Sequence, residues 1–355
     1  MVRAAARRGR RALRLRGDLG RRALRRRHRR DRLHGLLAGF VSAGCAAAAI
    51  EASSHGLAQD RLAGVECDVA VFTNIGQDHL DYHVDWDDYL RAKSLLFSRP
   101  ELQAAVVNAD DAHAEQVAAS ASCETFACGE SDGCDLAWRL AGRRAEFTHA
   151  GRSMGCELPM PGRHNASNLA LAIGAALQAG AAWDEVEERL ALLRPLPGRL
   201  EPIGAGAGRP AGYVDFAHTP EALAAALQAL RAEHPEGRLL CVFGCGGDRD
   251  RSKRPLMGAA ACAAADQVFV TTDNPRDEDP AAIAAEAMAG CDAKAVMILD
   301  RRAAIAAAAA AAGPADAVLV AGKGDEDEII GPGGARTSFS DREVLRGLLA
   351  GGANG

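Results

Sequence analysis

The sequence predicts an α/β protein in which a first α/β domain is followed by a doubly wound, Rossmann-like C-terminal domain. From Gly212 onward, apolar runs alternate with alanine-rich segments of helical spacing, which is the pattern of a parallel sheet flanked by helices. Residues 194–204, RPLPGRLEPIG, have the proline and glycine content of a hinge between domains. The length of 355 residues allows two or three domains with substantial cores.

Five runs in the C-terminal domain predict strands: GYVDF at 212–216, RLLCVFG at 238–244, QVFVTT at 267–272, AVMIL at 295–299 and AVLVAG at 317–322. After the first run, Thr219 is expected to cap a helix that has Pro220 in its first turn. Polar motifs follow four of the strands: Asp215 with His218, GCGGDRDRSKRP at 244–255, TDNPRDEDP at 272–280 and AGKGDEDE at 321–328. Because parallel strands end at one edge of a sheet, these motifs predict a binding site there.

In the first domain, residues 45–54 and 67–74 read as strands, and the second of them is expected to be buried. Glu51 lies at the tip of the first strand, and His79 follows shortly after the second. If both strands end at the same sheet edge, Glu51 and His79 could converge on one metal ion. The alternative is that Glu51 is a solvated loop residue.

Lys93 is expected to lie on the apolar face of a helix in DWDDYLRAKSLLFS, because Tyr89, Leu90, Leu96 and Phe97 stand three or four positions away. Burial favours a neutral amine, which can take up CO2 as a carbamate and then resembles a carboxylate ligand. The alternative is a lysine whose stem reaches the surface. Only four of the 42 Lys plus Arg residues are lysines, which favours a position that needs an amine.

The Arg-rich segment, residues 1–34, has 15 arginines and two aspartates, a formal charge of 15 − 2 = +13. Three interpretations stay open: an arm that binds RNA or anionic lipid, a targeting peptide, or a segment translated out of frame.

Several classes of protein are excluded. No apolar run of about 18 residues predicts a membrane span. The ten cysteines form no CxxC pair, which favours reduced core thiols in a cytoplasmic protein. VFGCGGDRD lacks the third glycine of the dinucleotide pattern, which argues against a dehydrogenase.

Three stretches, EASSHGLAQDR at 51–61, FTNIGQDHLDYH at 72–83 and RAKSLLFS at 91–98, resemble the central ATPase domain of the Mur ligase family. The resemblance is to the MurE type, which adds the third residue of the peptidoglycan stem peptide. It implies magnesium ligands at Glu51, His79 and a carbamylated Lys93, and a substrate site for UDP-N-acetylmuramoyl-dipeptide at Ser53, Gln59 and Arg61. It implies ATP contacts from Asn74, Asn165, Asn168, Arg199 and Asp215, and catalytic roles for Lys93, His79 and Asp215.

Two of those assignments have alternatives in the sequence itself. Asn165 and Asn168 stand at a predicted helix start, where asparagine commonly caps. Arg199 lies in the hinge and would reach the nucleotide as the domains close, but it could equally be a surface residue.

DNPR, residues 273–276, could be a type I turn with proline at its second position. Alternatively, Arg276 and Arg249 could bind a carboxylate, and Glu326 an ammonium group. In the family, DNPR marks enzymes that add meso-diaminopimelate instead of L-lysine. The resemblance implies that Arg249, Asp273, Asn274, Pro275, Arg276, Gly322 and Glu326 bind this amino acid. Asp325 stands where the family usually has histidine, and Phe216 where tyrosine is common.

The resemblance implies an ATP- and Mg²⁺-dependent ligase with two small-molecule substrates, no membrane partner and no nucleic acid. Residues 35–197 would be a central ATPase domain, partial because it has no phosphate loop of the GTNGKT kind, and residues 198–355 the amino-acid-binding domain. The alternatives are a remnant that binds diaminopimelate but not ATP, and a nucleic-acid-binding protein that uses its Arg-rich segment. DNPR and EASSH argue against the related folylpolyglutamate synthases.

Overall fold

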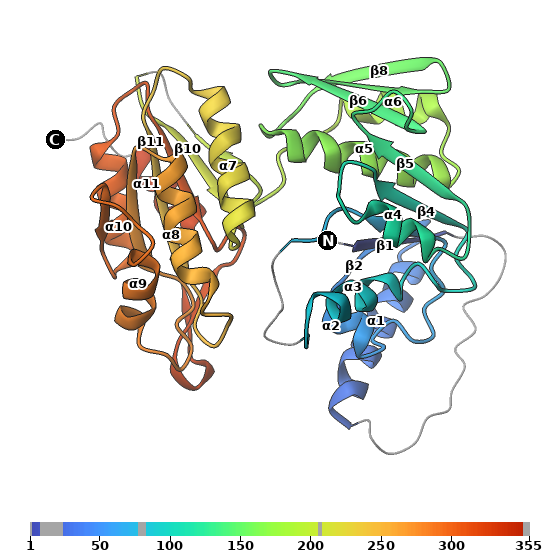
Figure 1. Cartoon of the computed structure of the whole chain (residues 1–355), viewed down its shortest axis with the longest axis horizontal. Helices are drawn as coiled ribbons and strands as arrows, with labels where there is room; N and C mark the ends of the chain where they lie inside the picture. The colour runs from blue at the N-terminus through green and yellow to red at the C-terminus, as the bar shows by residue number, and fades with distance from the viewer. Residues whose placement is uncertain (1, 8–23, 77–82, 205–207, 351–355) are drawn as a thin grey trace. The chain divides into compact units, whose positions relative to one another are not determined.

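The computed structural model describes residues 2–7, 24–76, 83–204 and 208–350, with side chains described from Arg32 onward (Figure 1). The chain divides into two compact units, described separately below. The first unit comprises Met1–Leu140, Arg144–Cys156 and Ala166–Leu192; the second comprises Ala141–Arg143, Glu157–Asn165 and Leu193–Gly355. Both units have sheets with parallel strands and flanking helices, so the predicted α/β class is confirmed.

An eight-stranded sheet in the order β2-β1-β3-β4-β5-β6-β7-β8 organises the first unit. Its strands are β1 (Val2–Arg7), β2 (Ala47–Ala52), β3 (Val69–Phe72), β4 (Ala104–Asn108), β5 (Thr125–Gly129), β6 (Leu136–Ala141), β7 (Arg144–His149) and β8 (Arg152–Glu157). Strands β3 to β6 are parallel, whereas β1 is antiparallel to both β2 and β3. A strand from the Arg-rich segment therefore separates β2 from β3, which the sequence analysis did not anticipate.

The helices of the first unit are α1 (Leu24–Ser42), α2 (Ser54–Ala58), α3 (Trp86–Ser94), α4 (Ala114–Ala119), α5 (Arg163–Gln178) and α6 (Trp183–Leu190), with the first residues of α5 belonging to the second unit. Helix α3 begins where the Asp85 carboxylate accepts the Asp88 backbone N–H at 2.7 Å. Its buried face holds Tyr89, Leu90 and Lys93, so the predicted apolar stripe around the lysine is confirmed.

A six-stranded sheet in the order β13-β12-β11-β14-β10-β9 organises the second unit. Its strands are β9 (Glu201–Ile203), β10 (Ala211–Asp215), β11 (Leu239–Cys245), β12 (Gln267–Thr272), β13 (Ala295–Met297) and β14 (Ala317–Ala321). All are parallel except β9, which runs antiparallel to β10. Each of the five predicted strands is present. A separate hairpin pairs β15 (Glu328–Ile330) with β16 (Arg336–Ser338), joined through the 3-10 turn Pro332–Gly334.

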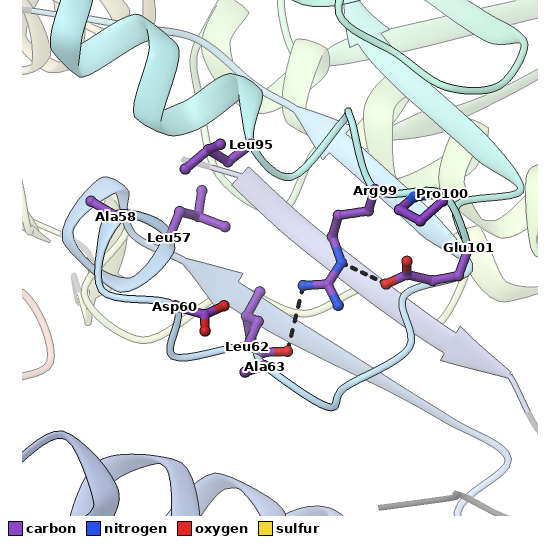
Figure 2. A pocket seen from close by; sticks show the side chains of 9 residues that line it. All are labelled: Leu57, Ala58, Asp60, Leu62, Ala63, Leu95, Arg99, Pro100 and Glu101. Atoms are coloured by element: carbon purple, nitrogen blue, oxygen red, sulfur yellow. Dashed lines mark hydrogen bonds and ion pairs between the residues drawn. The ribbon is translucent and has the colours of Figure 1, made fainter. Parts of the chain in front are cut away.

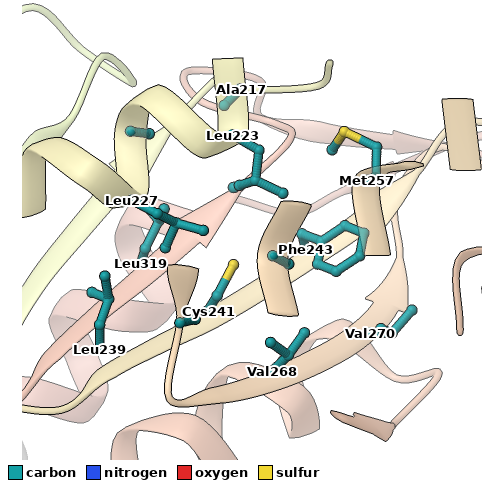
Figure 3. Close-up of a cluster of buried hydrophobic side chains, with 14 of the residues drawn as sticks. Ala217, Leu223, Leu227, Leu239, Cys241, Phe243, Met257, Val268, Val270 and Leu319 are labelled. Carbon is teal, nitrogen blue, oxygen red and sulfur yellow. The ribbon is translucent and has the colours of Figure 1, made fainter. Parts of the chain in front are cut away.

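Helices cover both faces of this sheet: α7 (Pro220–Glu233), α8 (Lys253–Ala264), α9 (Pro280–Met288), α10 (Arg301–Ala311) and α11 (Asp341–Ala350). Successive residues of β11 point to opposite faces, as a strand requires. Phe243 packs with Leu223 of α7 and Met257 of α8 (Figure 3), whereas Val242 belongs to the core under α10 with Ile305. The predicted doubly wound sheet is therefore confirmed, and Thr219 caps α7 as expected by accepting the Ala222 N–H.

A completely buried ion pair joins α10 to the start of α11. Arg301 Nε and Nη2 each lie 2.7 Å from a carboxylate oxygen of Asp341, and both side chains are at most 1% exposed. The same guanidinium donates to the carbonyls of Thr272 at 3.0 Å and Ala321 at 2.9 Å. These are the last residues of β12 and β14, the two strands that flank β11, so one side chain binds the ends of both.

All ten cysteines are free, and five of them, Cys67, Cys128, Cys241, Cys245 and Cys262, are buried as expected for core thiols. The prediction is wrong for Cys45, which is exposed, and Cys123, Cys134, Cys156 and Cys291 are only half-buried. Among the residues that the structure describes, we find no helix with the length and apolar character needed to cross a membrane.

Candidate functional site

The carboxyl ends of the parallel strands bring the predicted motifs of the second unit to one sheet edge. Asp215 ends β10, residues 246–249 follow β11, residues 273–276 follow β12 and residues 322–326 follow β14. Because β11 lies between β12 and β14, the segments with Arg249, Arg276 and Glu326 are neighbours. The fold thus brings together all seven residues that were predicted to bind diaminopimelate.

Arg249 and Arg276 form the cationic side of this edge. Arg276 donates to the Gly247 carbonyl at 2.6 Å, and Arg249 donates to the Asp248 carbonyl at 2.9 Å. Burial and the nearby charge of Arg249 lower the pKa of Arg276. Over the described ranges, neither guanidinium forms an ion pair with a carboxylate. Asp273, Asp248 and Glu326 act electrostatically on Arg276 without forming an ion pair with it. Two adjacent guanidinium groups without an ion-pair partner among the described residues favour the binding of a carboxylate from outside the chain.

The DNPR segment is not a type I turn, so that alternative is wrong. Arg276 has a φ of 53°, whereas both central residues of a type I turn have negative φ. Its backbone N–H donates to the Ile330 carbonyl at 3.0 Å, and Pro275 instead accepts from Glu278 N–H at 3.1 Å. Contacts from the β15–β16 hairpin therefore replace the local turn geometry that the sequence suggested.

Asp273 and Gly322 are in close contact. Asp273 is buried, and a Cβ built on Gly322 would lie 2.6 Å from one oxygen of its carboxylate. Gly322 also has a φ of 113°, a conformation that side-chain-bearing residues rarely adopt. Only glycine therefore fits where β14 leaves the sheet beside this carboxylate.

Asn274 and Glu326 share a network with Lys323. The Asn274 side-chain amide donates to Glu326 Oε2 at 2.9 Å, and Lys323 Nζ lies 3.0 Å from the same oxygen. Glu326 remains 37% exposed, so its carboxylate can also reach a ligand.

Beneath the loops, Arg254 of α8 connects the segments after β11 and β12. Its guanidinium donates to both carboxylate oxygens of Glu278, at 2.7 and 2.9 Å, and to the Gly246 carbonyl at 3.2 Å. The hydrogen bond from Arg254 lowers the pKa of Glu278 from 4.5 to about 2. This ion pair fixes the spacing of the two loops that carry Arg249 and Arg276.

The depressed pKa of Glu278 predicts an acid-sensitive contribution to stability. Because the folded pKa lies below the unfolded one, the contribution is complete above pH 4.5 and is lost as the pH falls towards 2. Urea unfolding at pH 6 and pH 3 should show a smaller loss of stability for Glu278→Gln than for the wild type. Equal losses would mean that Arg254 does not stabilise the ionised form of Glu278.

The buried side chain of Asp215, the last residue of β10, connects this strand to the hinge, residues 194–204. Its two carboxylate oxygens accept the backbone N–H groups of Leu200 at 2.6 Å and Ala217 at 2.7 Å. Burial raises its pKa in spite of these bonds. Arg199, beside it in the hinge, stacks its guanidinium 4.7 Å from the ring centre of Phe216. Asp215 and Arg199 both belong to the second unit, and their nucleotide roles stay predictions.

The hinge also contacts the loop after β14. Gly198 is buried with a φ of 63°, and a Cβ built on it would lie 2.2 Å from the backbone nitrogen of Asp325. The hinge turn and the Gly324–Asp325 backbone are therefore packed against each other.

In the first unit, Lys93 is 5% exposed and its Nζ lies 5.2 Å from the ring centre of Tyr89. Its burial contradicts the alternative of a lysine that reaches the surface. Glu51 is exposed on β2, and Asn74 is exposed just after β3. His79 lies outside the described residues, and within those ranges no group of three or more His, Cys, Asp and Glu side chains could hold a metal. Convergence of Glu51, His79 and Lys93 stays a prediction.

The proposed dipeptide residues cluster around α2. Ser53 caps this helix by accepting the Gly56 N–H at 3.1 Å, and Arg61 donates to Gln59 Oε1 at 2.8 Å. A pocket of about 420 Å³ lies beside them (Figure 2). It is lined by Leu57, Ala58, Asp60, Leu62, Ala63, Leu95, Arg99, Pro100 and Glu101. None of the predicted site residues lines this pocket.

Helix α5 begins at Arg163, so Asn165 lies in its first turn. The Asn165 amide donates to the Pro161 carbonyl at 2.7 Å and is buried, whereas Asn168 is exposed. Asn165 thus ties the helix start to the preceding segment, and only Asn168 presents its side chain to solvent.

Sequence reasoning gave no role to Lys323, Arg254 or the Arg301–Asp341 pair. The scarcity of lysine, which singled out Lys93, is a signal that applies equally to Lys323. The arginines carried no such signal, since the chain has 42 − 4 = 38 of them.

The chain is similar to known proteins over most of its length. The family model of the Mur ligase middle domain matches residues 30–176, and that of the Mur ligase glutamate ligase domain matches residues 198–324. The UDP-N-acetylmuramoyl-L-alanyl-D-glutamate–2,6-diaminopimelate ligase of Alkalilimnicola ehrlichii is 46% identical over 85% of this chain and 62% of its own length. The enzyme of the same name from Parasynechococcus marenigrum is 44% identical over 90% of this chain and 67% of its own.

Two solved structures extend the comparison. A structure of UDP-N-acetylmuramoyl-L-alanyl-D-glutamate–2,6-diaminopimelate ligase matches with a TM-score of 0.55 at 36% identity, covering 86% of this chain and 64% of that one. Folylpolyglutamate synthase of Mycobacterium tuberculosis, complexed with ADP, matches with a TM-score of 0.59 at 25% identity, covering 73% and 61%. This chain thus spans 62% to 67% of the length of the two curated relatives. Together with the strand-end motifs, these matches show that the chain belongs to the Mur ligase family.

Proposed function

We propose that this chain acts as an ATP-dependent amide ligase of the MurE type, which joins meso-diaminopimelate to UDP-N-acetylmuramoyl-L-alanyl-D-glutamate. ATP would phosphorylate the D-glutamyl carboxylate, and an amine of diaminopimelate would displace the phosphate from the acyl phosphate to form the amide. The names of the two curated relatives support this reaction.

The observation that carries the proposal is the charge pattern at the sheet edge of the second unit. Among the described residues no carboxylate forms an ion pair with Arg249 or Arg276, and Glu326 offers a carboxylate nearby. The far end of meso-diaminopimelate has both a carboxylate and an ammonium group, whereas L-lysine has only the ammonium group. The site therefore favours diaminopimelate.

For the nucleotide half, we propose that Asn74, Asn165, Asn168, Arg199 and Asp215 contact ATP and that Ser53, Gln59 and Arg61 bind the dipeptide substrate. The folylpolyglutamate synthase structure with ADP supports a nucleotide site in this fold. Glu51, His79 and a carbamylated Lys93 would hold magnesium, which neutralises phosphate charge when bound. The burial of Lys93 supports its part, because a buried amine favours the neutral form that carbamylation needs.

Isothermal titration of the full chain tests both halves. We expect meso-diaminopimelate to bind at least about tenfold more tightly than L-lysine, since one charge-assisted bond is worth about 1.5–3 kcal/mol. In a separate titration, we expect magnesium and ATP to bind, and Lys93→Met to remove the magnesium-dependent part. Diaminopimelate binding without ATP binding would favour a binding-only remnant, and no diaminopimelate binding would contradict the proposal.

A further inference from the structure

Lys323 is buried without being remote from the site. Its side chain is 0% exposed, and its Nζ lies 3.1 Å from Asn274 Oδ1 and 3.0 Å from Glu326 Oε2. For comparison, Lys294 is 35% exposed and its nearest carboxylate oxygen, on Asp292, is 3.8 Å away. Burying an ammonium group is costly unless its partners are well placed, so the position of Lys323 demands an explanation.

Lys323 sets the orientation of the Asn274 amide. Asn274 Oδ1 receives two donors, Lys323 Nζ at 3.1 Å and the Ile330 backbone N–H at 2.9 Å. An amide oxygen accepts hydrogen bonds, whereas an amide nitrogen only donates them. If the Asn274 amide were flipped, its NH2 group would point at two other donors, Lys323 Nζ and the Ile330 N–H, and no hydrogen bond could form. The nitrogen must therefore point at Glu326 Oε2, where it lies at 2.9 Å.

Within the part of the chain that the structure describes, Glu326 is bound through one carboxylate oxygen. Oε2 accepts from both Lys323 and Asn274, whereas the carboxylate as a whole remains 37% exposed. Fixing one oxygen of a carboxylate aims the other, which lowers the entropy lost when a ligand binds.

We propose that Lys323 is a positioning residue that orients Glu326, through Asn274 and directly, for the far-end ammonium group of the amino-acid substrate. The inference rests on the proposed function and adds a residue that contacts no substrate. The hairpin residue Ile330 extends the arrangement, because its carbonyl also accepts the Arg276 backbone N–H at 3.0 Å. Ile330 therefore hydrogen-bonds both to Arg276, at the carboxylate-binding end of the site, and to Asn274, at the ammonium-binding end.

The test compares two ligands on the full chain by isothermal titration. In Lys323→Met, we expect the affinity for meso-diaminopimelate to fall about 10- to 100-fold. This is the loss expected when one charge-assisted hydrogen bond is weakened or broken. The affinity for 2-aminopimelate, which has both carboxylates but lacks one amine, should change less than about threefold, because Glu326 has no ammonium group to bind. Lys294→Met is the matched control and should leave both affinities unchanged.

Equal losses for the two ligands, or no loss for either, would overturn the assignment of Lys323. Binding of meso-diaminopimelate by the wild type, with Lys323→Met indistinguishable from it, would overturn this inference alone. No binding by the wild type would overturn the proposed function as well.

A double-mutant cycle separates positioning from a general effect on folding. In a Glu326→Gln background, Lys323→Met should lower the affinity for meso-diaminopimelate by less than about threefold, because the group that it orients is gone. Independent, multiplicative losses would contradict the proposal. If thermal melting shows that Lys323→Met does not fold, Lys323→Gln, which keeps a donor for Asn274 without the charge, carries the same comparison.

Discussion

Replacing Asp341 with leucine is expected to lower the free energy of unfolding by about 3–5 kcal/mol, because the buried Arg301 guanidinium loses its counter-charge. Both side chains of this pair are at most 1% exposed, so water cannot take the place of the carboxylate. The loss is a large part of the 5–15 kcal/mol by which domains are usually stable. It should appear in urea unfolding followed by circular dichroism.

Three features of the chain sharpen this experiment. Trp86, Trp138 and Trp183 are the only tryptophans and all lie in the first unit, so their fluorescence reports that unit and gives an internal reference. The double variant Arg301→Met/Asp341→Leu should be more stable than Asp341→Leu alone, because it leaves no unpaired charge. Asp132→Ala breaks an ion pair that is exposed on both sides and should cost at most about 1 kcal/mol. A loss below about 1 kcal/mol in Asp341→Leu would show that the buried pair is unimportant.

Replacing Arg276 with methionine is expected to weaken the binding of meso-diaminopimelate about 100-fold. A guanidinium that binds a carboxylate through two charge-assisted hydrogen bonds contributes roughly 3 kcal/mol or more. Methionine keeps the length and apolar packing of the stem, so the change removes mainly the charge and the donors. L-lysine, which has no far-end carboxylate, should lose much less, and the preference between the two ligands should shrink. Competitive titration of both ligands measures this.

Arg251→Met is the matched control for Arg276→Met. Arg251 belongs to the same motif, but its guanidinium is paired with Glu286 and exposed at the surface. Its loss should leave the affinity for diaminopimelate unchanged. If Arg251→Met and Arg276→Met weaken binding alike, the effect is the loss of general positive charge, and the assignment of Arg276 as a specific ligand is wrong.

Most of the fold of the second unit could be predicted because its signals are local. The strand of residues 267–272 is visible as a β-branched run, and the caps at Thr219 and Asp279 are short-range hydrogen bonds. By contrast, β1 could not be predicted, since its pairing with β2 and β3 joins residues that are forty or more positions apart. Nothing in the arginine-rich composition of residues 1–34 indicates a strand.

In the site, too, some features could be predicted from the sequence and others depend on contacts between distant residues. That residues 273–276 and 322–326 share an edge follows from parallel topology alone. The orientation of Asn274 does not, because it depends on Ile330, which lies 56 positions along the chain. The turn predicted for DNPR was wrong for a related reason: the hairpin contacts override the local preference of proline.

The Arg301–Asp341 pair also constrains how the sequence can diverge. Either residue changed alone leaves a charge buried where water cannot reach it, so each single step is selected against, whereas a joint replacement by apolar residues is tolerated. Positions 301 and 341, 40 residues apart, are therefore expected to change together among related sequences. The Arg301 guanidinium also donates hydrogen bonds to the carbonyls of Thr272 and Ala321. A lineage that exchanged the pair would release two strand ends at once and could alter its amino-acid preference without any change in the residues that touch the ligand.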